Sequence, residues 1–506
     1  MTDSLRPELS ALYERLALTQ DKNRAGAASK RHAKGYRTAR ENLEDLVDPD
    51  SFQEYGQLAV AAQRSRRSKE DLQSNTPADG IITGICTINS ALVGQQASQA
   101  AVIINDYSVL AGTQGYYHHK KLDRICELVQ SLNIPAVMYT EGGGGRPGDT
   151  DILTGVSGLN VPSFLIWASL QGVVPRIAIN NGYCFAGNAA LFGSADFRIA
   201  TQSSWIGMAG PAMIEGGGLG RFKADQIGPI DVQEKNGVVD IVAQDEKEAT
   251  AIAKNLLAYF QGDIRQWRAK DQSGLRNVLP SDRRWSYSVR EIIETIADEG
   301  SFIELRRIYG RSVITGFVRI KGKPMALLAN DCQQLGGAID TDASQKMTRF
   351  IRLVGAFNMP MLSLVDTPGF MVGPDSEAEA AVLHMPDVFS AGASVDVPFI
   401  AITLRKAYGL GAMAMVGGSF ARPVYAASWP TGEFGAMGLE GAVKLGYSKE
   451  LEAIEDPDQR ELRFNELLMQ MYETGKATET ASFLEIDAVI DPADTREVIL
   501  RALLAT

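Results

Sequence analysis

The chain has 506 residues, of which 45% are apolar and 22% charged, and its formal net charge is −11. This length and composition are typical of two or more globular domains, and the acidic balance argues against a protein that binds nucleic acid. The four cysteines form no C-x-x-C pair and no apolar run is long enough for a membrane span, so we expect a cytoplasmic protein with reduced thiols and no transmembrane helix.

Residues 1–75 have a polar helical pattern that begins as a charged amphipathic helix rather than as a signal peptide. Basic residues cluster at 30–40 and 64–69, which fits either a solvated helix face or a site for an anionic ligand tail. From about residue 79, short β-branched segments such as AAVIINDY, IPAVMYT and VPRIAIN alternate with Gly-rich turns and helical stretches. This alternation predicts the α/β class. Residues 262–285 are polar without an apolar period, so we expect a linker there, between domains at 1–262 and 285–506.

One stretch of the first domain, SLNIPAVMYTEGGGGRPGDTD (131–151), carries an apolar run into four consecutive glycines. Glycines lower the stability of a loop, so they indicate a backbone that something approaches closely or that needs a positive φ. A P-loop would need Lys followed by Ser or Thr, and the dinucleotide fingerprint would need a helix that Pro147 and Gly148 oppose. The loop therefore belongs to neither class of phosphate site.

The second half repeats the first. Pro135 pairs with Pro360, Gly187 with Gly411 and Trp205 with Trp429, at separations of 224 or 225 residues. Such a long period indicates a tandem duplication of one domain rather than a solenoid. In each half a strand runs into a turn of small residues, CFAGNAA and YGLGAMAM. Backbone N–H groups at such a turn bind negative charge, so the pattern favours two oxyanion holes, with close helix–strand packing as the alternative.

Several long motifs make the chain similar to the carboxyltransferase (β) subunit of biotin-dependent acyl-CoA carboxylases, of the propionyl-, methylcrotonyl- or geranyl-CoA carboxylase type. They are RHAKGYRTARENLEDLVDPDSFQE near the start, and DEGSFIEL, GGAIDTDASQKMTRFIRL, FNMPMLSLVDTPGF, RKAYGLGAMAM and WPTGEFGAMGLEGA in the second half. The resemblance implies two crotonase-like (ClpP-like) α/β domains in tandem. It also implies a hexamer, a trimer of dimers, with sites formed between the N-domain of one chain and the C-domain of another.

The resemblance further implies the reaction. A carboxyl group would pass from carboxybiotin, held on a separate carrier protein, to the α or vinylogous carbon of an acyl-CoA. Biotin would be the cofactor, a biotin carboxylase/biotin carboxyl carrier subunit the partner, and a coenzyme A thioester the substrate, with no metal. One hole would hold the biotin enolate and the other the thioester enolate, and the biotin nitrogen would take the α-proton, so no side-chain base is required. The chain contains no Ala-Met-Lys-Met biotinylation motif and no ATP-grasp loop, so we expect both on the partner.

Site residues follow from the positions of the family's motifs. Gly187 and Asn188 would form the N-domain hole for the thioester, and Leu410 and Gly411 the C-domain hole for biotin, with Ala412 as the alternative to Leu410. The other residues expected to bind substrate are Gly142, Gly143, Gly144, Gly145 and Arg146 of the Gly-rich loop, Ala111, Gly112 and Thr113 of YSVLAGTQG, and Ala186, Tyr408 and Ala412 beside the turns. The Gly-rich loop would be a wall of the acyl-CoA site.

Three departures from the family lie near this pocket and leave the acyl group open. Asn188 replaces the second glycine of a pair, YGLGAM is nearer the YGAGN form of branched or long acyl-CoA members than the YGGAY form, and EGGGGRPGDTD replaces SGGARIQEG. The competing functions are a biotin-dependent acyl-CoA decarboxylase that runs in reverse, a crotonase-type hydratase or isomerase, which would need an acidic side chain in the pocket, and a non-enzymatic scaffold.

Other side chains have simpler interpretations. Neighbouring residues on a helix point in different directions, so His118 and His119 are not expected to share a metal ion. Asp366 fits a turn better than a catalytic pair with Asp375. Cys184 is expected to be buried rather than nucleophilic.

Overall fold

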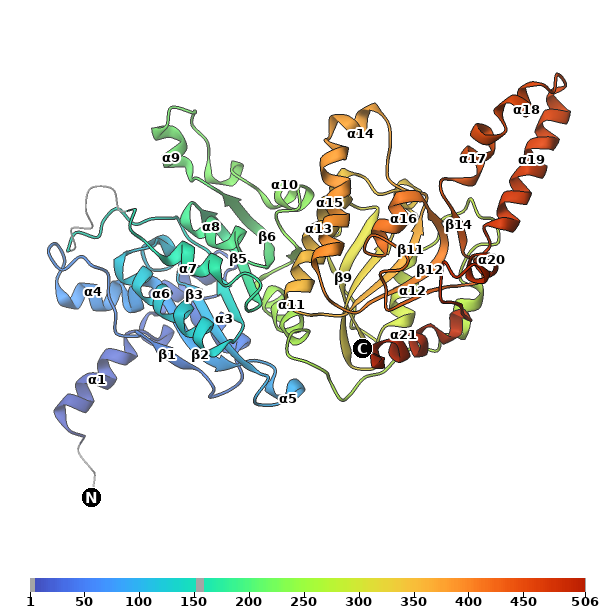
Figure 1. The fold of residues 1–506 in the computed structure, drawn as a ribbon. Coiled ribbons are helices and arrows are strands. Elements are labelled where there is room, and N and C mark those ends of the chain that lie inside the picture. Colours follow the sequence, from blue (N-terminus) through green and yellow to red (C-terminus); the bar gives the residue numbers. More distant parts are fainter. Residues whose placement is uncertain (1–4, 152–158, 506) are drawn as a thin grey trace. The chain divides into compact units, whose positions relative to one another are not determined.

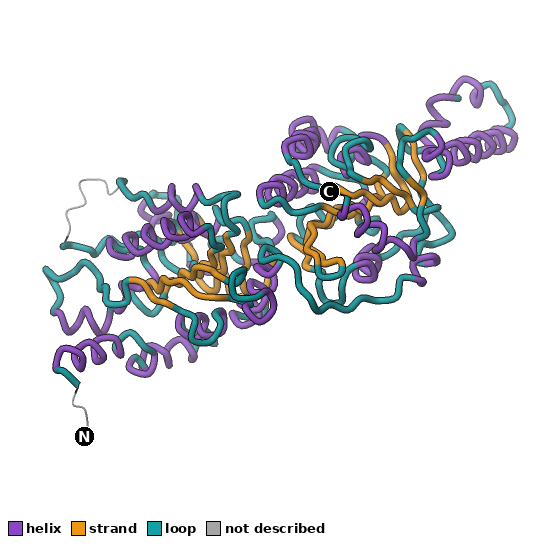
Figure 2. The backbone as a smooth tube through the Cα atoms, turned by 60° about the horizontal axis from the view of Figure 1, so that its bottom comes forward, coloured by secondary structure: helices purple, strands orange, loops and turns teal. Residues whose placement is uncertain are grey.

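The computed structural model describes residues 5–151 and 159–505. The chain forms two compact units, Met1–Gly262 and Asp263–Thr506 (Figure 1). In each unit a β-sheet lies between helices, which Figure 2 shows as orange strands flanked by purple helices. The α/β prediction is therefore confirmed. Among the described residues no helix is long and apolar enough to cross a bilayer.

The first unit is built on a seven-stranded sheet of order β1-β2-β3-β4-β5-β6-β7. The pairs β1–β2 and β2–β3 are antiparallel, and all later pairs are parallel. The strands are β1 (Gln53–Tyr55), β2 (Ile81–Thr87), β3 (Gln99–Asn105), β4 (Ala136–Tyr139), β5 (Arg176–Phe185), β6 (Phe197–Gly207) and β7 (Ile241–Ala243). The α-helices are α1 (Pro7–Ala17), α2 (Ala25–His32), α3 (Ala39–Leu46), α4 (Lys69–Asn75), α5 (Ser90–Val93), α6 (Tyr116–Leu132), α7 (Ser163–Ser169), α8 (Gly187–Gly193), α9 (Pro211–Gly216), α10 (Ile230–Lys235) and α11 (Glu246–Ala258).

Helices cover this sheet because its central strands are apolar on both faces. Helix α6 packs against β2 and β3, and α11 packs against β5, β6 and β7. Strand β4 is buried along its whole length. The chain reaches β4 through Asn133, which closes α6 in the left-handed conformation, and Pro135, which favours an extended backbone at its neighbour. The sequence around 133–139 thus ends a helix and starts a buried strand.

The second unit has an eight-stranded sheet, in which β15-β13-β12-β11-β10-β9-β8 lie side by side and β14 pairs with β12. Again the first pairs, β8–β9 and β9–β10, are antiparallel and the later ones are parallel. The strands are β8 (Ile303–Leu305), β9 (Val313–Ile320), β10 (Lys323–Asn330), β11 (Met361–Thr367), β12 (Phe399–Tyr408), β13 (Tyr425–Ser428), β14 (Glu433–Gly435) and β15 (Ala488–Val489). The α-helices are α12 (Val289–Ile296), α13 (Thr341–Ala356), α14 (Pro374–Ala378), α15 (Ala381–Ser394), α16 (Gly409–Met415), α17 (Leu439–Gly446), α18 (Ser448–Glu452), α19 (Pro457–Thr474), α20 (Ala477–Ser482) and α21 (Thr495–Leu504).

The shared strand order supports the duplication, with one correction to the register of the repeat. After β5 the backbone adopts a positive φ at Ala186 (50°), and after β12 it does so at Gly409 (58°). The turns therefore superpose Gly187 on Leu410 and Asn188 on Gly411. The sequence repeat aligned Gly187 with Gly411, which is one residue away from the match in the structure. The predicted pair Gly187 and Asn188 still corresponds to the predicted pair Leu410 and Gly411.

The segment expected to be a linker packs within the second unit. Leu275, in the 3₁₀ turn Ser273–Asn277, is buried in the core of that unit. Arg276 pairs with Asp491 at 2.7 Å. The segment was expected to be a linker because its apolar residues are few, but Leu275 is buried in the core and Val278 and Leu279 pack against it. The assignment of a separate functional domain to each unit stays a prediction.

Candidate active site

Two loops of the first unit meet beside the turn between β5 and α8. The Gly143 N–H donates to the carbonyl of Ala111 at 3.1 Å, and the Gln114 N–H donates to the carbonyl of Gly144 at 2.8 Å. On its other side the Gly-rich loop pairs with the end of β5, because the Phe185 N–H donates to the carbonyl of Gly142 at 3.0 Å. The predicted residues of YSVLAGTQG and of the Gly-rich loop thus lie together, next to the predicted N-domain hole.

Asn188 fastens this arrangement with its side chain. Its Oδ1 accepts a hydrogen bond from the Gly144 N–H at 3.0 Å, and its Nδ2 donates to the carbonyl of Gly112 at 3.4 Å. The residue is fully buried. In the second unit the matching position is Gly411, and a Cβ there would lie 2.5 Å from the backbone of Gly369. One unit therefore joins turn and loop through a side-chain amide, whereas the other packs their backbones directly.

The four glycines of the loop divide into two kinds. Gly142 and Gly144 are buried, whereas Gly143 and Gly145 are exposed. A Cβ on Gly142 would lie 2.3 Å from Asn188 Nδ2, and one on Gly144 would lie 2.7 Å from the Cβ of Ala186. A Cβ on Gly145 would meet nothing within 4 Å. Close packing within the protein thus accounts for two of the glycines, and the other two face outward.

Arg146 does not extend toward the exposed side of the loop. Its side chain is 4% exposed and pairs with Asp79 at 2.5 Å and with Asp149 at 3.5 Å. Its Nη2 donates to the carbonyl of Thr113 at 2.7 Å. These contacts anchor the far end of the Gly-rich loop, so they favour a structural role over the predicted contact with substrate.

The turn itself presents free donors. The first N–H groups of a helix have no acceptor within the helix. Within residues 5–151 and 159–505, no hydrogen bond uses the N–H of Gly187 or Asn188. The positive φ of Ala186 directs the chain from β5 into α8 at this point. Two free N–H groups at one turn are the kind of donors that an oxyanion hole requires.

The second unit repeats the feature. Gly409 turns the chain from β12 into α16, and Leu410 is 62% exposed. The described hydrogen bonds of this unit include none from the N–H of Leu410 or Gly411. Tyr408 precedes the turn, and its hydroxyl donates to Glu433 at 2.9 Å. Ala412 is buried beneath the turn, so its side chain belongs to the packing.

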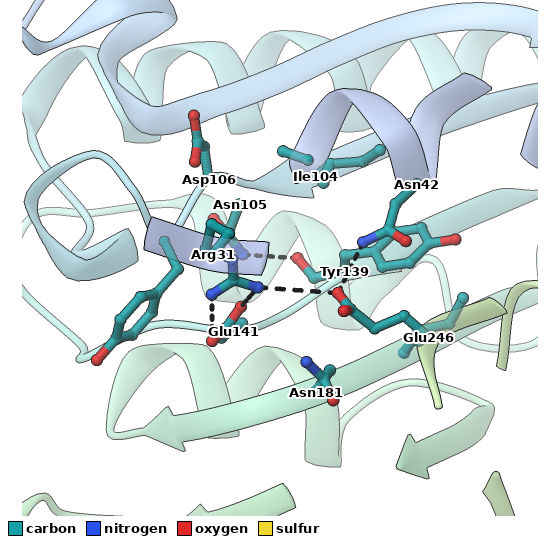
Figure 3. Close-up of a pocket in the computed structure, with 12 residues that line it drawn as sticks. Arg31, Asn42, Ile104, Asn105, Asp106, Tyr139, Glu141, Asn181 and Glu246 are labelled. Atoms are coloured by element: carbon teal, nitrogen blue, oxygen red, sulfur yellow. Dashed lines mark hydrogen bonds and ion pairs between the residues drawn. The ribbon is translucent and has the colours of Figure 1, made fainter. Parts of the chain in front are cut away.

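A buried ionic cluster lies directly before the Gly-rich loop (Figure 3). Arg31 of α2 donates to both carboxylate oxygens of Glu141, at 2.9 and 2.7 Å, and its Nη2 lies 3.8 Å from Glu246. Burial raises the pKa of Glu141 to about 7, against the opposing effect of Arg31. Burial also raises the pKa of Glu246, which accepts a hydrogen bond from Asn42. Two carboxylates thus share the guanidinium of Arg31. These contacts hold α2 beside the Gly-rich loop.

An open cavity of 970 Å³ extends from this cluster along α2. The cations Lys30 and Lys34 line it and are exposed, and none of the described residues forms an ion pair with either. Tyr183 and Trp205 also line it, with their ring centroids 5.0 Å apart. Free ammonium groups beside an aromatic surface suit a ligand with phosphates and a ring system.

Three other residues singled out in the sequence are buried within the protein. His118 is fully buried, and burial lowers its pKa well below the usual value. Asp366 is buried, and its carboxylate pairs with Arg405 and accepts hydrogen bonds from the Tyr287 hydroxyl and the Lys406 N–H, so its charge is compensated within the protein. Cys184 is buried, and burial raises the pKa of its thiol to about 12. Among the described residues, no group of three His, Cys, Asp or Glu side chains could hold a metal ion.

Comparison with known proteins decides the family. The sequence profile of the carboxyl transferase domain matches residues 30–506. The chain belongs to this family. The predicted resemblance, the crotonase-like fold class and the assignment as a carboxyl-transferring enzyme are thereby confirmed.

Three known proteins show how far this carboxyl transferase resembles its relatives. The methylmalonyl-CoA carboxyltransferase 12S subunit of Propionibacterium freudenreichii subsp. shermanii is 31% identical over 99% of this chain and 95% of its own length. The crystal structure of transcarboxylase 12S, described as a hexamer with methylmalonyl-coenzyme A bound, has a TM-score of 0.86 at 28% identity and covers 100% of this chain and 96% of its own. A single-chain, multi-domain long-chain acyl-CoA carboxylase has a TM-score of 0.93 at 51% identity. That match includes 99% of this carboxyl transferase chain but only 49% of the longer protein.

Some residues of the carboxyl transferase site could not be anticipated from motifs. Gln114 stands inside a quoted motif, but nothing in the sequence shows that its side chain faces Gly187. The exposed Lys30 and Lys34 fit both alternatives for the basic run at 30–40, a solvated helix face and a site for an anionic ligand tail. Arg31 of the same run is instead buried against Glu141. The structure was needed to separate the exposed cations of this run from the buried one.

Proposed function

We propose that the chain is the carboxyltransferase component of a biotin-dependent acyl-CoA carboxylase. The observation that carries the proposal is that a turn with a positive φ, followed by two N–H groups that have no acceptor among the described residues, occurs once in each of two units of like topology. Two such turns suit a reaction with two oxyanions, one on each reactant. A hydratase or isomerase would use one turn and an acidic side chain.

The turn of the first unit is assigned to the acyl-CoA. The N–H groups of Gly187 and Asn188 would hold the thioester oxygen as negative charge develops on it, and would thereby acidify the α-carbon. The exposed Gly143 and Gly145 would lie along the thioester and pantetheine. This is the half of the predicted loop that packing does not account for.

The cavity along α2 is assigned to the other end of coenzyme A. Lys30 and Lys34 would meet its phosphates, and Tyr183 and Trp205 would contact its adenine or pantetheine. Arg31 cannot serve the phosphates directly because both of its terminal nitrogens are directed at Glu141. Its role would be to hold α2, and therefore the two lysines, beside the site.

The turn of the second unit is assigned to biotin. Carboxybiotin on its carrier supplies the carboxyl group and, afterwards, the nitrogen that accepts the α-proton. The residues present fit such a group, since Leu410 is exposed and the N–H groups of Leu410 and Gly411 have no acceptor among the described residues. Leu410 would offer an apolar side chain to the ring, and the two N–H groups would bind its carbonyl oxygen.

The partners belong to the proposal as well. The carboxyl group would come from a biotin carboxylase/biotin carboxyl carrier component, and the long-chain carboxylase at 51% identity makes long-chain acyl-CoA the first substrate to test. The hexamer described for transcarboxylase 12S suggests the same trimer of dimers here, with sites shared between chains. A decarboxylase would use the same groups in reverse, so the physiological direction depends on the partner.

Transfer without the partner tests the proposal. The full chain is incubated with free biotin and 2-carboxyacyl-CoAs of increasing chain length, labelled in the free carboxyl group. We expect label on biotin only when enzyme and both substrates are present, with the highest kcat/KM for long chains. Hydration of enoyl-CoA without biotin-dependent transfer would contradict the proposal and favour the crotonase-type alternative.

A further inference from the structure

We propose that Gln114 is a further substrate-binding residue of the acyl-CoA half of the site, and that its side-chain amide donates a hydrogen bond to the thioester oxygen beside Gly187. The inference rests on the proposed function, whose family-based assignment supplies only backbone donors at this turn. It adds a side chain that reaches the same place from a different loop.

The backbone of Gln114 is fixed to the Gly-rich loop. Its N–H donates to the carbonyl of Gly144 and its carbonyl accepts from the Arg146 N–H, both at 2.8 Å. These bonds form a parallel bridge with Gly145. The position from which the side chain starts is therefore set by the loop that lies beside the predicted substrate.

The side chain lies against the turn. A Cβ placed on Gly187 would be 2.2 Å from Gln114 Oε1 and 3.1 Å from the ring of Phe164. Only a glycine at 187 leaves room for this amide. Gln114 is 4% exposed, so the amide is held in position rather than free in solvent.

The nitrogen of the Gln114 amide lacks a hydrogen-bond acceptor among the described residues. This nitrogen, Nε2, is buried. Buried donors in folded proteins are almost always paired, so a free one at the edge of a predicted binding site points to a partner outside the chain. Rotation by 180° about the last side-chain bond exchanges Nε2 and Oε1, so the donor can face Gly187 in the same space.

The surroundings suggest which ligand atom completes the bond. The N–H groups of Gly187 and Asn188 also lack acceptors among the described residues, whereas Phe164 is apolar and offers none. With the amide turned so that Nε2 faces Gly187, three unpaired donors would meet at this turn, which suits an oxygen that becomes negatively charged. In an acyl-CoA that atom is the thioester oxygen. A neutral amide can hold it without giving up a proton.

The test compares two matched substitutions in the full-length chain. Gln114→Met keeps the length of the side chain and removes the donor. Gln130→Met makes the same chemical change at an exposed position of α6. Both are assayed for label transfer from the best 2-carboxyacyl-CoA to free biotin. Binding of free coenzyme A, which has no acyl oxygen, is measured by calorimetry.

We expect Gln114→Met to lower kcat/KM by about 10²–10³, the usual effect of losing one oxyanion donor, and to leave the affinity for free coenzyme A within about two-fold. Gln130→Met should match the wild type. Equal activity of Gln114→Met and the wild type would overturn the inference while leaving the proposed function intact. A parallel loss of activity and coenzyme A affinity would overturn it in favour of a purely structural role. If the wild type transferred no label, the proposed function itself would fail, and the inference with it.

Discussion

At the scale of single residues, Asn188 joins turn and loop through its side-chain amide, whereas the duplicate unit has Gly411 at this position and packs the two backbones directly. The Asn188 amide satisfies the Gly144 N–H, which is buried. Asn188→Ala would leave that N–H without an acceptor, so we expect the free energy of unfolding to fall by about 1–3 kcal/mol. Urea denaturation measures the change. Asn277→Ala, at an exposed position, should change it by no more than about 0.5 kcal/mol. Equal stability of the two variants would contradict the role assigned to the amide.

The raised pKa of Glu141 predicts that the free energy of unfolding depends on pH. Its pKa is raised from 4.5 to about 7 in the folded chain, chiefly by burial, so between these values the folded state holds a proton that the unfolded state has released. The stabilisation contributed by Glu141 is therefore complete below pH 4.5 and is lost as the pH rises toward 7. Relative to Glu141→Gln, the wild type should lose unfolding free energy across this interval.

Urea denaturation of both proteins at several pH values between about 4.5 and 8 measures this difference, with Arg31 charged throughout. A difference that stays constant with pH would show that Glu141 is already ionised when folded, and that Arg31 outweighs the effect of burial.

At the scale of elements, the sequence indicated where the strands, the turns and the bare loop occur, but not what the loop touches. Short β-branched runs and the repeated small-residue turns are local signals, and they located β4, β5 and β12. The reason for the glycines is not local. Gly142 is required by Asn188, which lies far along the chain, and Arg146 is held by Asp79. Partners of this kind appear only when distant segments are placed in three dimensions.

The Gly-rich loop gives a prediction with an internal control. Gly142→Ala would bring a Cβ within 2.3 Å of both Asn188 Nδ2 and the carbonyl of Gly112, so we expect Tm to fall by roughly 5–10 °C. Gly145→Ala meets nothing within 4 Å and should melt as the wild type does. If the thioester passes the exposed face of the loop, Gly145→Ala should nevertheless raise KM for the acyl-CoA. Equal melting temperatures for the two variants would contradict the packing described here.

At the scale of the whole molecule, the duplication was readable from sequence because landmark residues recur at one spacing. The limits of the second unit were not, because Leu275, Val278 and Leu279 anchor a segment that otherwise resembles a linker. Large apolar side chains remain exposed in the first unit on the segment after β6, namely Met208, Met213, Leu219 and Phe222. If these side chains form one contiguous patch, an interface would cover them.

The proposed hexamer can be tested by mass. Light scattering at micromolar concentration should give six times the 54.7 kDa mass of one chain for the hexamer, or twice the mass of one chain for a dimeric subassembly. An active monomer would be incompatible with sites shared between chains. Replacing Met213 by Lys should shift the mass downward if the exposed segment lies in an interface, because a buried unpaired charge is costly. A surface methionine outside an interface would tolerate the change.

The central claim is that each turn holds one of the two oxyanions, and Leu410 allows its most direct test. Proline is tolerated in the first turn of a helix and lacks an N–H, so Leu410→Pro removes one donor of the biotin turn, whereas Leu410→Ala shortens the side chain and keeps it. The measurement is the rate at which chemically prepared carboxybiotin loses CO₂ on the enzyme without acyl-CoA. The account predicts that Leu410→Pro is slower than Leu410→Ala by about 10²–10³, while both bind free coenzyme A as the wild type does. Equal rates for the two variants would contradict it.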